Sequence, residues 1–330
     1  MCNMMTLLLS LLQLMWTGPQ SDPWTAPLAP AEDPAFTAEL QETPGFWAGK
    51  ADEVWLRQLQ RNEIVSISFN RGGSSVSLRF TFKDGSMAAF KPDQHHEQTV
   101  PRFEIAAYRM NRLLGMSRVP PATWRRISKA ELFEHLDEKS RIARNRILEE
   151  VQWGKDGTVA GAVSVWIPVI RALPLETFEF RRKWVRWLAP YDYLWQEEYS
   201  LAGQISNMIL FDFLVNNPDR FTGNNTLSDE RMKRLYYMDN TYAFYPRGDG
   251  SSSGRQYLRI ARRYSEKMIR SLQRLDIRTI RSEVVEVAGA PWPILSDEEI
   301  EALLQRKEYL IREITRNIAH FGWEKTVVFP

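Results

Sequence analysis

Short runs of alternating apolar and polar residues mark the start of the part of the chain with a clear folding pattern. Residues 64–69 and 76–82 alternate in this way on either side of a turn rich in glycine and serine, residues 70–75. A further run, residues 87–91, follows and ends on Lys91. Because successive side chains of a strand point to opposite faces of a sheet, this period of two predicts three consecutive antiparallel strands.

The pattern changes to a helical period after the strands. In residues 103–114 the apolar side chains recur every three or four positions, and Gly115 is suited to end that helix. The second half of the chain is mostly helical, with an apolar segment at 205–215 and a long final helix. Ser296 followed by Glu299 predicts a capping box at the start of the final helix. Its predicted buried stripe consists of Ile300, Leu303, Leu304, Ile311, Ile314 and Ile318.

Two further segments complete the order of elements. Residues 129–150 are charged and predict helix, whereas residues 158–169 are small and β-branched and predict a strand that leads toward a hinge. The order predicts the α+β class with two lobes. The first, over residues 46–170, is small and β-rich, and the second, over residues 171–330, is mostly helical.

The first 45 residues do not share this periodicity. Residues 6–16 form an apolar run that is too short to cross a bilayer but suits the middle of a signal peptide, which predicts a signal-peptide region at 1–20. Residues 21–45 are rich in proline, alanine and acidic residues and predict a linker. We therefore expect a secreted or periplasmic protein without a stable membrane span. A cytoplasmic protein is the alternative, because residues 1–5 contain no lysine or arginine.

Composition excludes several classes of protein. The chain is 44% hydrophobic and 25% charged, which is typical of a globular protein, and its net charge of +2 gives no general attraction to nucleic acid or anionic lipid. We therefore expect no nucleic-acid partner. Cys2 is the only cysteine, so no disulfide can form within the chain. The four histidines do not have the spacing of zinc ligands.

The residues that follow the apolar helix at 205–215 are the strongest candidates for chemistry. Asp219 can orient an attacking hydroxyl or accept its proton, and Asn224, five positions later, can bind a divalent cation through its amide oxygen. The alternative is an Asx-turn loop in which these side chains only satisfy nearby backbone groups. Residues 226–235 then predict a hairpin that leads to a short aromatic strand.

Asp239 stands at the end of that aromatic strand. Two carboxylates delivered to one edge by neighbouring strand ends suit a magnesium- or manganese-bound triphosphate, because both ions prefer hard oxygen ligands. The alternative is that Asp239 and Asn240 only open a turn.

The predicted small lobe supplies groups that bind phosphate. Lys91 can pair with Glu104, in the first turn of the next helix, and so be held toward phosphate oxygens. The turn that contains Gly72, Gly73 and Ser74 would let backbone amides approach a nucleotide. Each residue also has an ordinary role, as a solvated lysine, a glutamate at a helix start or a plain turn.

The order of these features is more informative than any one of them. A glycine turn, a strand lysine, a helix glutamate, a hinge strand, an Asp-(four)-Asn loop and a late strand aspartate follow one another as in a protein-kinase fold. The chain contains no G-x-G-x-x-G, H-R-D or D-F-G sequence.

On these residues the chain resembles the secretory-pathway atypical kinases, the family that includes the Golgi casein kinase, the glycosaminoglycan xylosylkinase and the four-jointed kinases. More remotely it is similar to the HipA-type and phosphatidylinositol kinases. The similarity covers residues 64–244 and is carried by 103–114 with Ser117-Arg118-Val119-Pro120-Pro121, Ala89-Phe90-Lys91-Pro92, Asp212-Phe213-Leu214 with Asn217-Pro218-Asp219-Arg220, and 235–240.

The resemblance implies a role for each matching residue. Lys91 would contact nucleotide phosphates, Glu104 would support the lysine or a metal, Asp219 would be the catalytic aspartate and Asp239 would hold the metal. It also implies ATP with Mn²⁺ or Mg²⁺ as cofactors, and transfer of the γ-phosphate to a hydroxyl of a protein or a glycan. An activating partner or a dimer is compatible with this function.

Departures from the family keep other functions open. The secreted animal members contain disulfides that this chain cannot form, so it looks like a distant and bacterial relative. Phe221 stands where the family often has histidine, Thr241 stands where it often has glycine, and Asn224 is more similar to HipA-type loops. The alternatives are a pseudokinase that binds nucleotide and activates a partner, and a cytoplasmic HipA-like kinase. A third is a carbohydrate-binding scaffold, suggested by tryptophans that include Trp184, Trp187 and Trp195.

Overall fold

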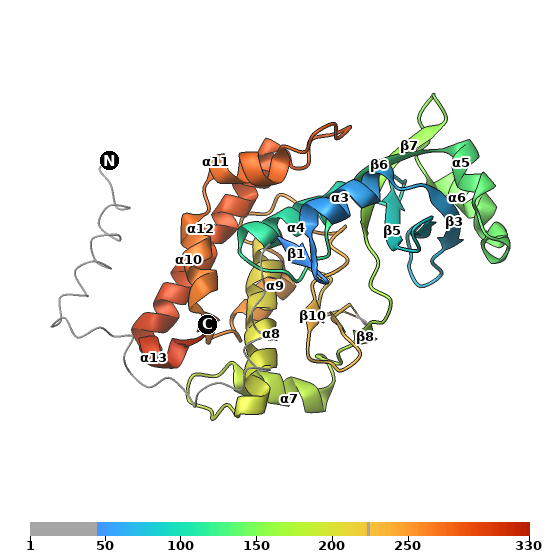
Figure 1. Cartoon of the computed structure of the whole chain (residues 1–330). Coiled ribbons are helices and arrows are strands. Elements are labelled where there is room, and N and C mark those ends of the chain that lie inside the picture. Colours follow the sequence, from blue (N-terminus) through green and yellow to red (C-terminus); the bar gives the residue numbers. More distant parts are fainter. Residues whose placement is uncertain (1–44, 223–224) are drawn as a thin grey trace. The chain divides into compact units, whose positions relative to one another are not determined.

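Five strands form the main sheet of the computed structural model, which describes residues 45–222 and 225–330 (Figure 1). Each strand is antiparallel to its neighbours, and their order is β3-β4-β5-β7-β6. The strands are β3 Ile64–Phe69, β4 Leu78–Phe82, β5 Met87–Pro92, β6 Ala122–Ser128 and β7 Thr158–Val165. The three predicted consecutive strands are therefore confirmed, and β7 corresponds to the strand predicted before the hinge.

The second strand begins two residues later than its alternation predicts. The backbone of Val76 does not bond to a neighbouring strand. Instead, its N–H donates to the amide oxygen Oε1 of Gln94 at 2.7 Å, and its carbonyl accepts from Gln94 Nε2 at 3.0 Å. A buried side chain from a distant part of the chain thus replaces the sheet partner at this position.

Short helices surround the sheet. They are α3 Asp52–Arg61, α4 Arg102–Leu113, α5 Lys129–Glu134, the 3₁₀ helix η2 Glu138–Ala143 and α6 Arg144–Glu150, and a two-stranded hairpin of β1 Phe46–Trp47 and β2 Lys50–Ala51 precedes them. The predicted helical segment at 129–150 is thus divided into three pieces. Gly115 has a φ of +74°, as expected of a glycine that ends a helix.

Helices dominate the rest of the chain. They are α7 Phe178–Trp187, α8 Gln196–Val215, α9 Ser252–Leu258, α10 Glu266–Arg274, α11 Ile277–Ile280, the π-helix η3 Arg281–Val285, α12 Asp297–Phe321 and α13 Trp323–Thr326. Small sheets join them, formed by β8 Arg171–Ala172, β9 Leu227–Ser228 and β10 Leu235–Tyr236, and by β11 Tyr264–Ser265 and β12 Val327–Phe329. None of the helices that the structure describes has both the length and the apolar character needed to cross a membrane.

The predicted capping box of the last helix is confirmed. The Ser296 hydroxyl accepts from the Glu299 N–H at 3.2 Å, and the Glu299 carboxylate accepts from the Ser296 N–H at 2.8 Å. The predicted stripe is correct at Ile300, Leu303 and Ile314, which are buried, and partly correct at Leu304 and Ile318, which are half-buried against the same cluster. It is wrong at Ile311, which is only half-buried, because Leu310 is the buried residue there. A period of 3.6 residues puts position 310, rather than 311, in line with buried Leu303 and Ile314.

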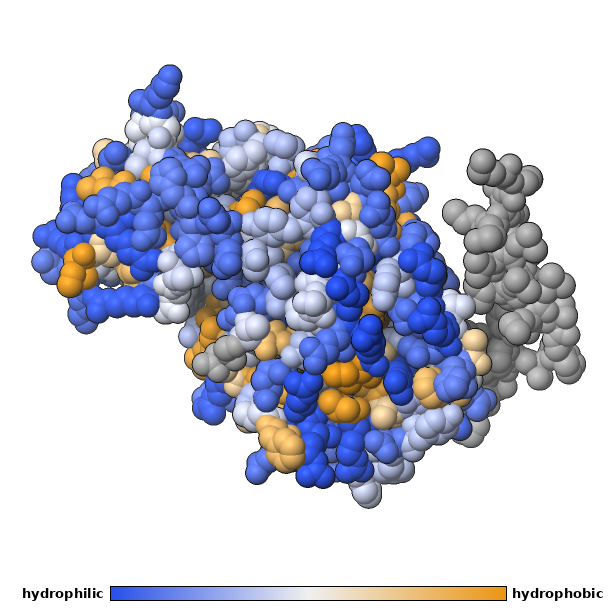
Figure 2. Space-filling view, turned by 180° about the vertical axis from the view of Figure 1, so that it is seen from behind, coloured by the Kyte–Doolittle hydropathy of each residue, from blue (hydrophilic) through white to orange (hydrophobic). Residues whose placement is uncertain are grey.

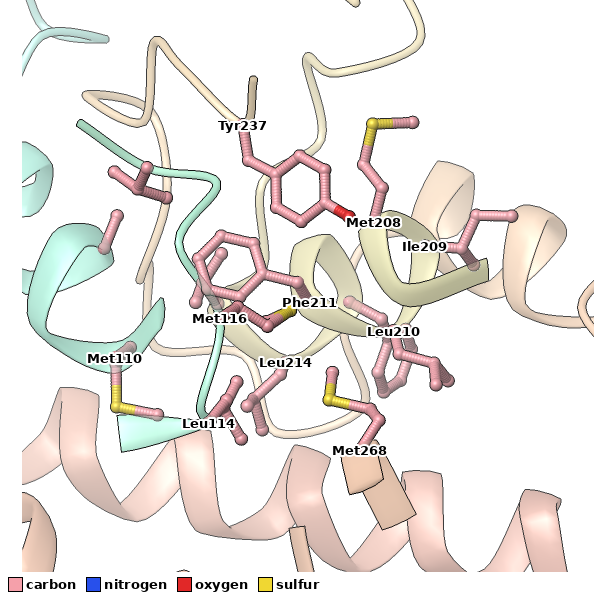
Figure 3. Packing of buried hydrophobic residues seen from close by; sticks show 14 of the residues in the cluster. Met110, Leu114, Met116, Met208, Ile209, Leu210, Phe211, Leu214, Tyr237 and Met268 are labelled. Atoms are coloured by element: carbon pink, nitrogen blue, oxygen red, sulfur yellow. The ribbon is translucent and has the colours of Figure 1, made fainter. Parts of the chain in front are cut away.

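Buried apolar residues form two clusters. One lies within the sheet, and the larger one surrounds α8 and includes the buried side chains of α4, so that Leu114 at the end of α4 lies beside Leu214 of α8 (Figure 3). The helix that carries Glu104 therefore packs on the helical half of the protein. The face shown in Figure 2, on the opposite side from the view of Figure 1, is largely hydrophilic, and its hydrophobic residues form separate small patches.

The tryptophans that suggested a scaffold function differ in their surroundings. Trp184 and Trp187 are buried in the larger cluster, whereas Trp195 is 57% exposed. Packing therefore explains the first two. The described residues, from Gly45 onward, belong to one compact unit. The signal-peptide region predicted at 1–20 and nearly all of the linker predicted at 21–45 lie outside the described residues, as does Asn224.

Candidate active site

Lys91 lies between two carboxylates that come from distant parts of the chain. Its Nζ donates to Glu104 Oε1 at 2.7 Å and to Asp239 Oδ1 at 2.7 Å. The side chains of Lys91 and Glu104 are only 16% and 11% exposed, while that of Asp239 is 55% exposed. The structure thus brings three predicted site residues together and leaves one of the two carboxylates open to solvent.

Close approach of two strands places the lysine. In the β5–β7 pair, Lys91 is opposite Ala162 and Pro92 is opposite Gly161. A Cβ atom at Gly161 would lie 2.4 Å from the carbonyl oxygen of Lys91, much closer than any side chain allows. Glycine is therefore required here, because a larger residue would push β7 away from the strand that carries the lysine.

Electrostatics keep Lys91 and Asp239 ionised. Burial on its own lowers the pKa of Lys91, but Asp239 and Glu104 more than offset that effect, so its pKa lies above the usual 10.5. The positive charge of Lys91 in turn holds the pKa of Asp239 below its usual 3.8. The Lys91 ammonium and the Asp239 carboxylate therefore both stay charged across the neutral pH range.

The backbone at Asp239 is held in a sparsely populated conformation. Its φ of +58° lies in the left-handed region, which disfavours most residues but is tolerated by aspartate and asparagine. The Asn217 Nδ2 atom donates to the Asp239 carbonyl and to Asn240 Oδ1, each at 3.2 Å. These bonds join the loop that contains Asp239 to the loop that contains Asp219.

Asp219 lies on an exposed loop whose other residues bind its carboxylate. The Asp219 N–H donates to Asn217 Oδ1 at 3.1 Å, Asn225 Nδ2 donates to Asp219 Oδ2 at 2.7 Å, and the Thr222 hydroxyl donates to Oδ1. The local bonds expected of an Asx-turn loop are therefore present. They also fix the direction of the carboxylate, so a structural role and a chemical role are compatible at this residue.

Arg220 lies in a motif that carries the family resemblance, but the sequence assigned it no role, and it organises the site through several contacts. Its side chain is fully buried, and its Nε donates to Asp212 Oδ2 of α8 at 3.0 Å. Its Nη2 donates to Asn240 Oδ1 at 2.9 Å, and its Nη1 to the Met238 carbonyl. The loops of Asp219 and Asp239 are thus bound to the same helix end. In the sequence, Asp212 and Arg220 stand eight residues apart at the end of a predicted helix. Such a pair is too common to predict a buried ion pair by itself.

The buried carboxylate of Asp212 predicts a pH-dependent stability. Burial raises the pKa of Asp212 from 3.8 to about 6, despite the opposing effect of Arg220. The folded protein thus holds this proton more tightly than the unfolded chain does. The group's contribution to stability is complete below about pH 4 and is lost as the pH rises to about 6. In Asp212→Asn this part of the pH dependence disappears, which urea unfolding of both proteins at several pH values between about 4 and about 7 will measure. Parallel pH profiles for the two proteins would contradict the assignment.

The predicted glycine turn lies at one end of the main sheet. Because Leu78 is opposite Phe90, the turn that contains Gly72, Gly73 and Ser74 lies at the same end of the sheet as Lys91. The Arg146 side chain donates to the Ser74 carbonyl. A nucleotide-binding role for this turn stays a prediction.

The donor set suits a hard cation. Glu104 and Asp239 present carboxylate oxygens that already converge on one cationic nitrogen, and Mn²⁺ and Mg²⁺ prefer such ligands, with water and phosphate in the remaining positions. In the described part of the chain no cluster of three or more His, Cys, Asp or Glu side chains is arranged to hold a metal unaided. The residues therefore fit a metal that arrives with its nucleotide, rather than a closed protein cage.

The protein has an atypical protein-kinase-like fold with a β-rich part and a helical part. Its candidate site contains a sheet lysine that is paired with a helix glutamate and with a late aspartate. The chain belongs to the family described as the four-jointed box protein middle domain, whose profile matches residues 50–242, more than half of the chain. The family resemblance and the fold class drawn from the sequence are thus confirmed.

Known proteins agree with this assignment. The human extracellular serine/threonine protein kinase FAM20C is 24% identical over 215 residues, which make up 52% of this chain and 37% of that protein. The matched part is thus well under half of that relative. The crystal structure of the Golgi casein kinase has a TM-score of 0.68 at 18% identity and covers 86% of this chain and 80% of its own. For hydra Fam20 with sugar, the TM-score is 0.66 at 15% identity, covering 91% and 99%. These structures show that the fold is shared.

Proposed function

We propose that the protein is a metal-dependent kinase that transfers the γ-phosphoryl group of ATP to a hydroxyl of a protein or a glycan. The observation that carries the proposal is the position of Lys91, held at 2.7 Å from both Glu104 and Asp239. The Lys91 ammonium has three N–H groups, and two of them bind these carboxylates. The third can donate to a phosphate oxygen. The family assignment supports the same conclusion.

Each group has a distinct task in the transfer. Asp239, with Glu104 beside it, would hold a divalent cation, which when bound neutralises charge on the β- and γ-phosphates. The acceptor oxygen attacks the γ-phosphorus, the bond from that phosphorus to the bridging oxygen breaks, and ADP leaves. The Asp219 carboxylate orients the acceptor hydroxyl and takes its proton. Thr222 and Asn225 hold that carboxylate in a fixed direction.

Relatives support the choice of cofactors and location. One solved Golgi casein kinase structure is described with Mn/ADP bound, with a TM-score of 0.67 and 17% identity. This supports ATP with Mn²⁺, and Mg²⁺ is the second candidate. The human relative is described as extracellular, which supports secretion or a periplasmic location. An activating partner or a dimer belongs to the same proposal.

The first test is phosphate transfer from labelled ATP with Mn²⁺, with Mg²⁺ and with a chelator, using casein and a xylose-terminated glycan as acceptors. We expect transfer that needs the metal and is lost in Lys91→Met. Lys83→Met is the matched control, because Lys83 lies beside the same sheet but is paired with Glu63 at the exposed surface. It should keep full activity. Nucleotide binding without any transfer would replace this proposal with a pseudokinase that activates a partner.

A further inference from the structure

Arg306 of α12 is a fully buried arginine that forms no ion pair with any acidic residue the structure describes. Its exposed fraction is 0%, and in the described part of the chain no carboxylate contributes to its electrostatics. Burial lowers the pKa of its guanidinium from 12.5 to about 9, so the group remains charged at neutral pH. An unpaired buried charge is unfavourable for folding. The arginine lies outside residues 50–242, the segment that matches the family.

The guanidinium binds backbone carbonyls of two segments. Its Nε donates to the Leu214 carbonyl at 2.7 Å and its Nη1 to the Arg247 carbonyl at 2.8 Å, while Nη2 has no hydrogen-bond partner in the described part of the chain. Leu214 belongs to the last turn of α8, where carbonyls lack partners within the helix. The negative end of the helix dipole thus takes the place of a carboxylate.

Both of these segments lead to the candidate active site. Two residues after Leu214, Asn216 takes a left-handed φ of +56°, and the next residue, Asn217, binds the loops of Asp219 and Asp239. Arg247 lies eight residues after Asp239, in a segment we call the 244–251 segment.

The 244–251 segment packs closely on the end of α8. The Phe244 N–H donates to the Val215 carbonyl at 2.5 Å, and the Ser251 N–H donates to Asn216 Oδ1 at 2.8 Å. A Cβ at Gly250 would lie 2.8 Å from the ring of Phe213, which shows how little space separates the two. A shift of this segment would therefore move the start of the Asp219 loop as well.

A second contact of α12 lies two helical turns away on the same face. Glu299 forms a two-pronged ion pair with Arg102 at the start of α4, with both N–O distances at 2.7 Å. Glu104 follows Arg102 by two residues, so α12 contacts the helix of the lysine partner at position 299 and the origin of the Asp219 loop at position 306. Residues seven apart on a helix share a face.

We propose that Arg306 is a positioning residue, which fixes the end of α8 and the 244–251 segment so that Asp219 faces the phosphates held at Lys91. The inference rests on the proposed kinase function. Methionine would fill the same space without a buried charge, so the arginine's contribution lies in placing these two segments. Phosphoryl transfer is sensitive to such placement, because an error of about 1 Å lowers the rate roughly 100-fold.

The test compares Arg306→Met and Arg306→Lys with wild type. We expect kcat to fall roughly 100-fold in Arg306→Met while the KM for ATP changes little, because the groups that bind nucleotide are not altered. Arg306→Lys, which keeps the charge but cannot reach both carbonyls in the same geometry, should recover part of the activity. Leu310→Ala, a buried substitution one turn along α12, controls for lost stability and should keep kcat per folded molecule. Unchanged kcat in Arg306→Met, or an equal loss in Leu310→Ala, would overturn the proposal.

Hydrogen exchange tests the same proposal without an activity measurement. The amides of Asn217 and Phe244, which donate to the end of α8, should exchange faster in Arg306→Lys than in wild type. The amide of Phe90 in β5 should not change. Unchanged exchange at the first two amides would show that Arg306 does not hold these segments. A wild-type protein without phosphate transfer would instead contradict the kinase function alone.

Discussion

Asp219→Asn is expected to lower kcat roughly 10²–10⁴-fold, the usual contribution of a positioned general base. The amide keeps the shape of the carboxylate, and its oxygen can still accept the hydrogen bond from Thr222. Its NH2 group faces Asn225, which can accept from it once the Asn225 amide is turned over, so the loop should retain its conformation. It cannot take the proton of the acceptor hydroxyl. Because Asp219 does not contact Lys91 or Glu104 directly, the affinity for metal-bound nucleotide should stay within about twofold of wild type. Steady-state transfer assays and calorimetric titration with Mn²⁺ and ADP measure the two quantities.

A matched control separates this role from simple loop structure. Asp229 lies in the nearby β9–β10 turn, where its carboxylate accepts backbone N–H bonds from Lys233 at 2.7 Å and Arg234 at 2.9 Å. Asp229→Asn removes a turn-stabilising carboxylate of the same kind without touching the candidate site. If both variants lose activity equally, or if Asp219→Asn retains it, Asp219 has only the structural role of an Asx-turn residue.

Local patterns were sufficient to predict several elements. The strands near Lys91, the helix that carries Glu104 and the capping box at Ser296 each depend on neighbours within a few residues, and the structure confirms them. The hairpin before Asp239 is confirmed for the same reason, since Leu235 pairs with Ser228. Such elements are encoded by alternation, helical period and end caps, which are visible in a single sequence.

Contacts between distant residues were beyond these patterns. Arg220 and Arg306 are both buried and both bind the end of α8. The family motif contains Arg220 without indicating this contact, and in sequence Arg306 resembles any other basic residue of a charged helix. Asn111 of α4 is similar, because its buried amide oxygen accepts from the N–H groups of Arg118 and Val119 at 2.8 and 3.1 Å. That contact joins the helix of Glu104 to the turn that follows it. Polar residues that bind backbone over long sequence separations follow no period, so only the fold reveals them.

The order of the candidate residues proved more informative than their individual types. Lys91 and Asp239 are 148 residues apart, and nothing local connects them. The positions of Lys91 and Glu104 predicted that these two residues could pair, and the structure shows that pair with Asp239 on the same lysine. The kinase-like order of elements placed Lys91 and Asp239 in one site, but it did not predict their direct contact.

Asp239→Asn is expected to remove metal-dependent nucleotide binding. The substitution exchanges a carboxylate for a neutral amide, and we expect the affinity for Mn²⁺ with ADP to fall at least roughly 10–100-fold. Stability should change little, because asparagine tolerates the φ of +58° at this position. In a thermal unfolding assay, Mn²⁺ with ADP should raise the Tm of wild type but not that of the variant, since only a ligand that binds the folded state stabilises it.

Comparison with Asp239→Ala distinguishes charge from backbone strain. Alanine also lacks the carboxylate but adds an unfavourable left-handed conformation of about 1–2 kcal/mol, so it should unfold at a lower temperature and bind nucleotide no better than asparagine. Equal loss of binding in both variants, with loss of stability in alanine alone, assigns the effect to the charge that faces Lys91. If Asp239→Asn binds Mn²⁺ and ADP as tightly as wild type, Asp239 only neutralises Lys91, and the metal must be held by other groups.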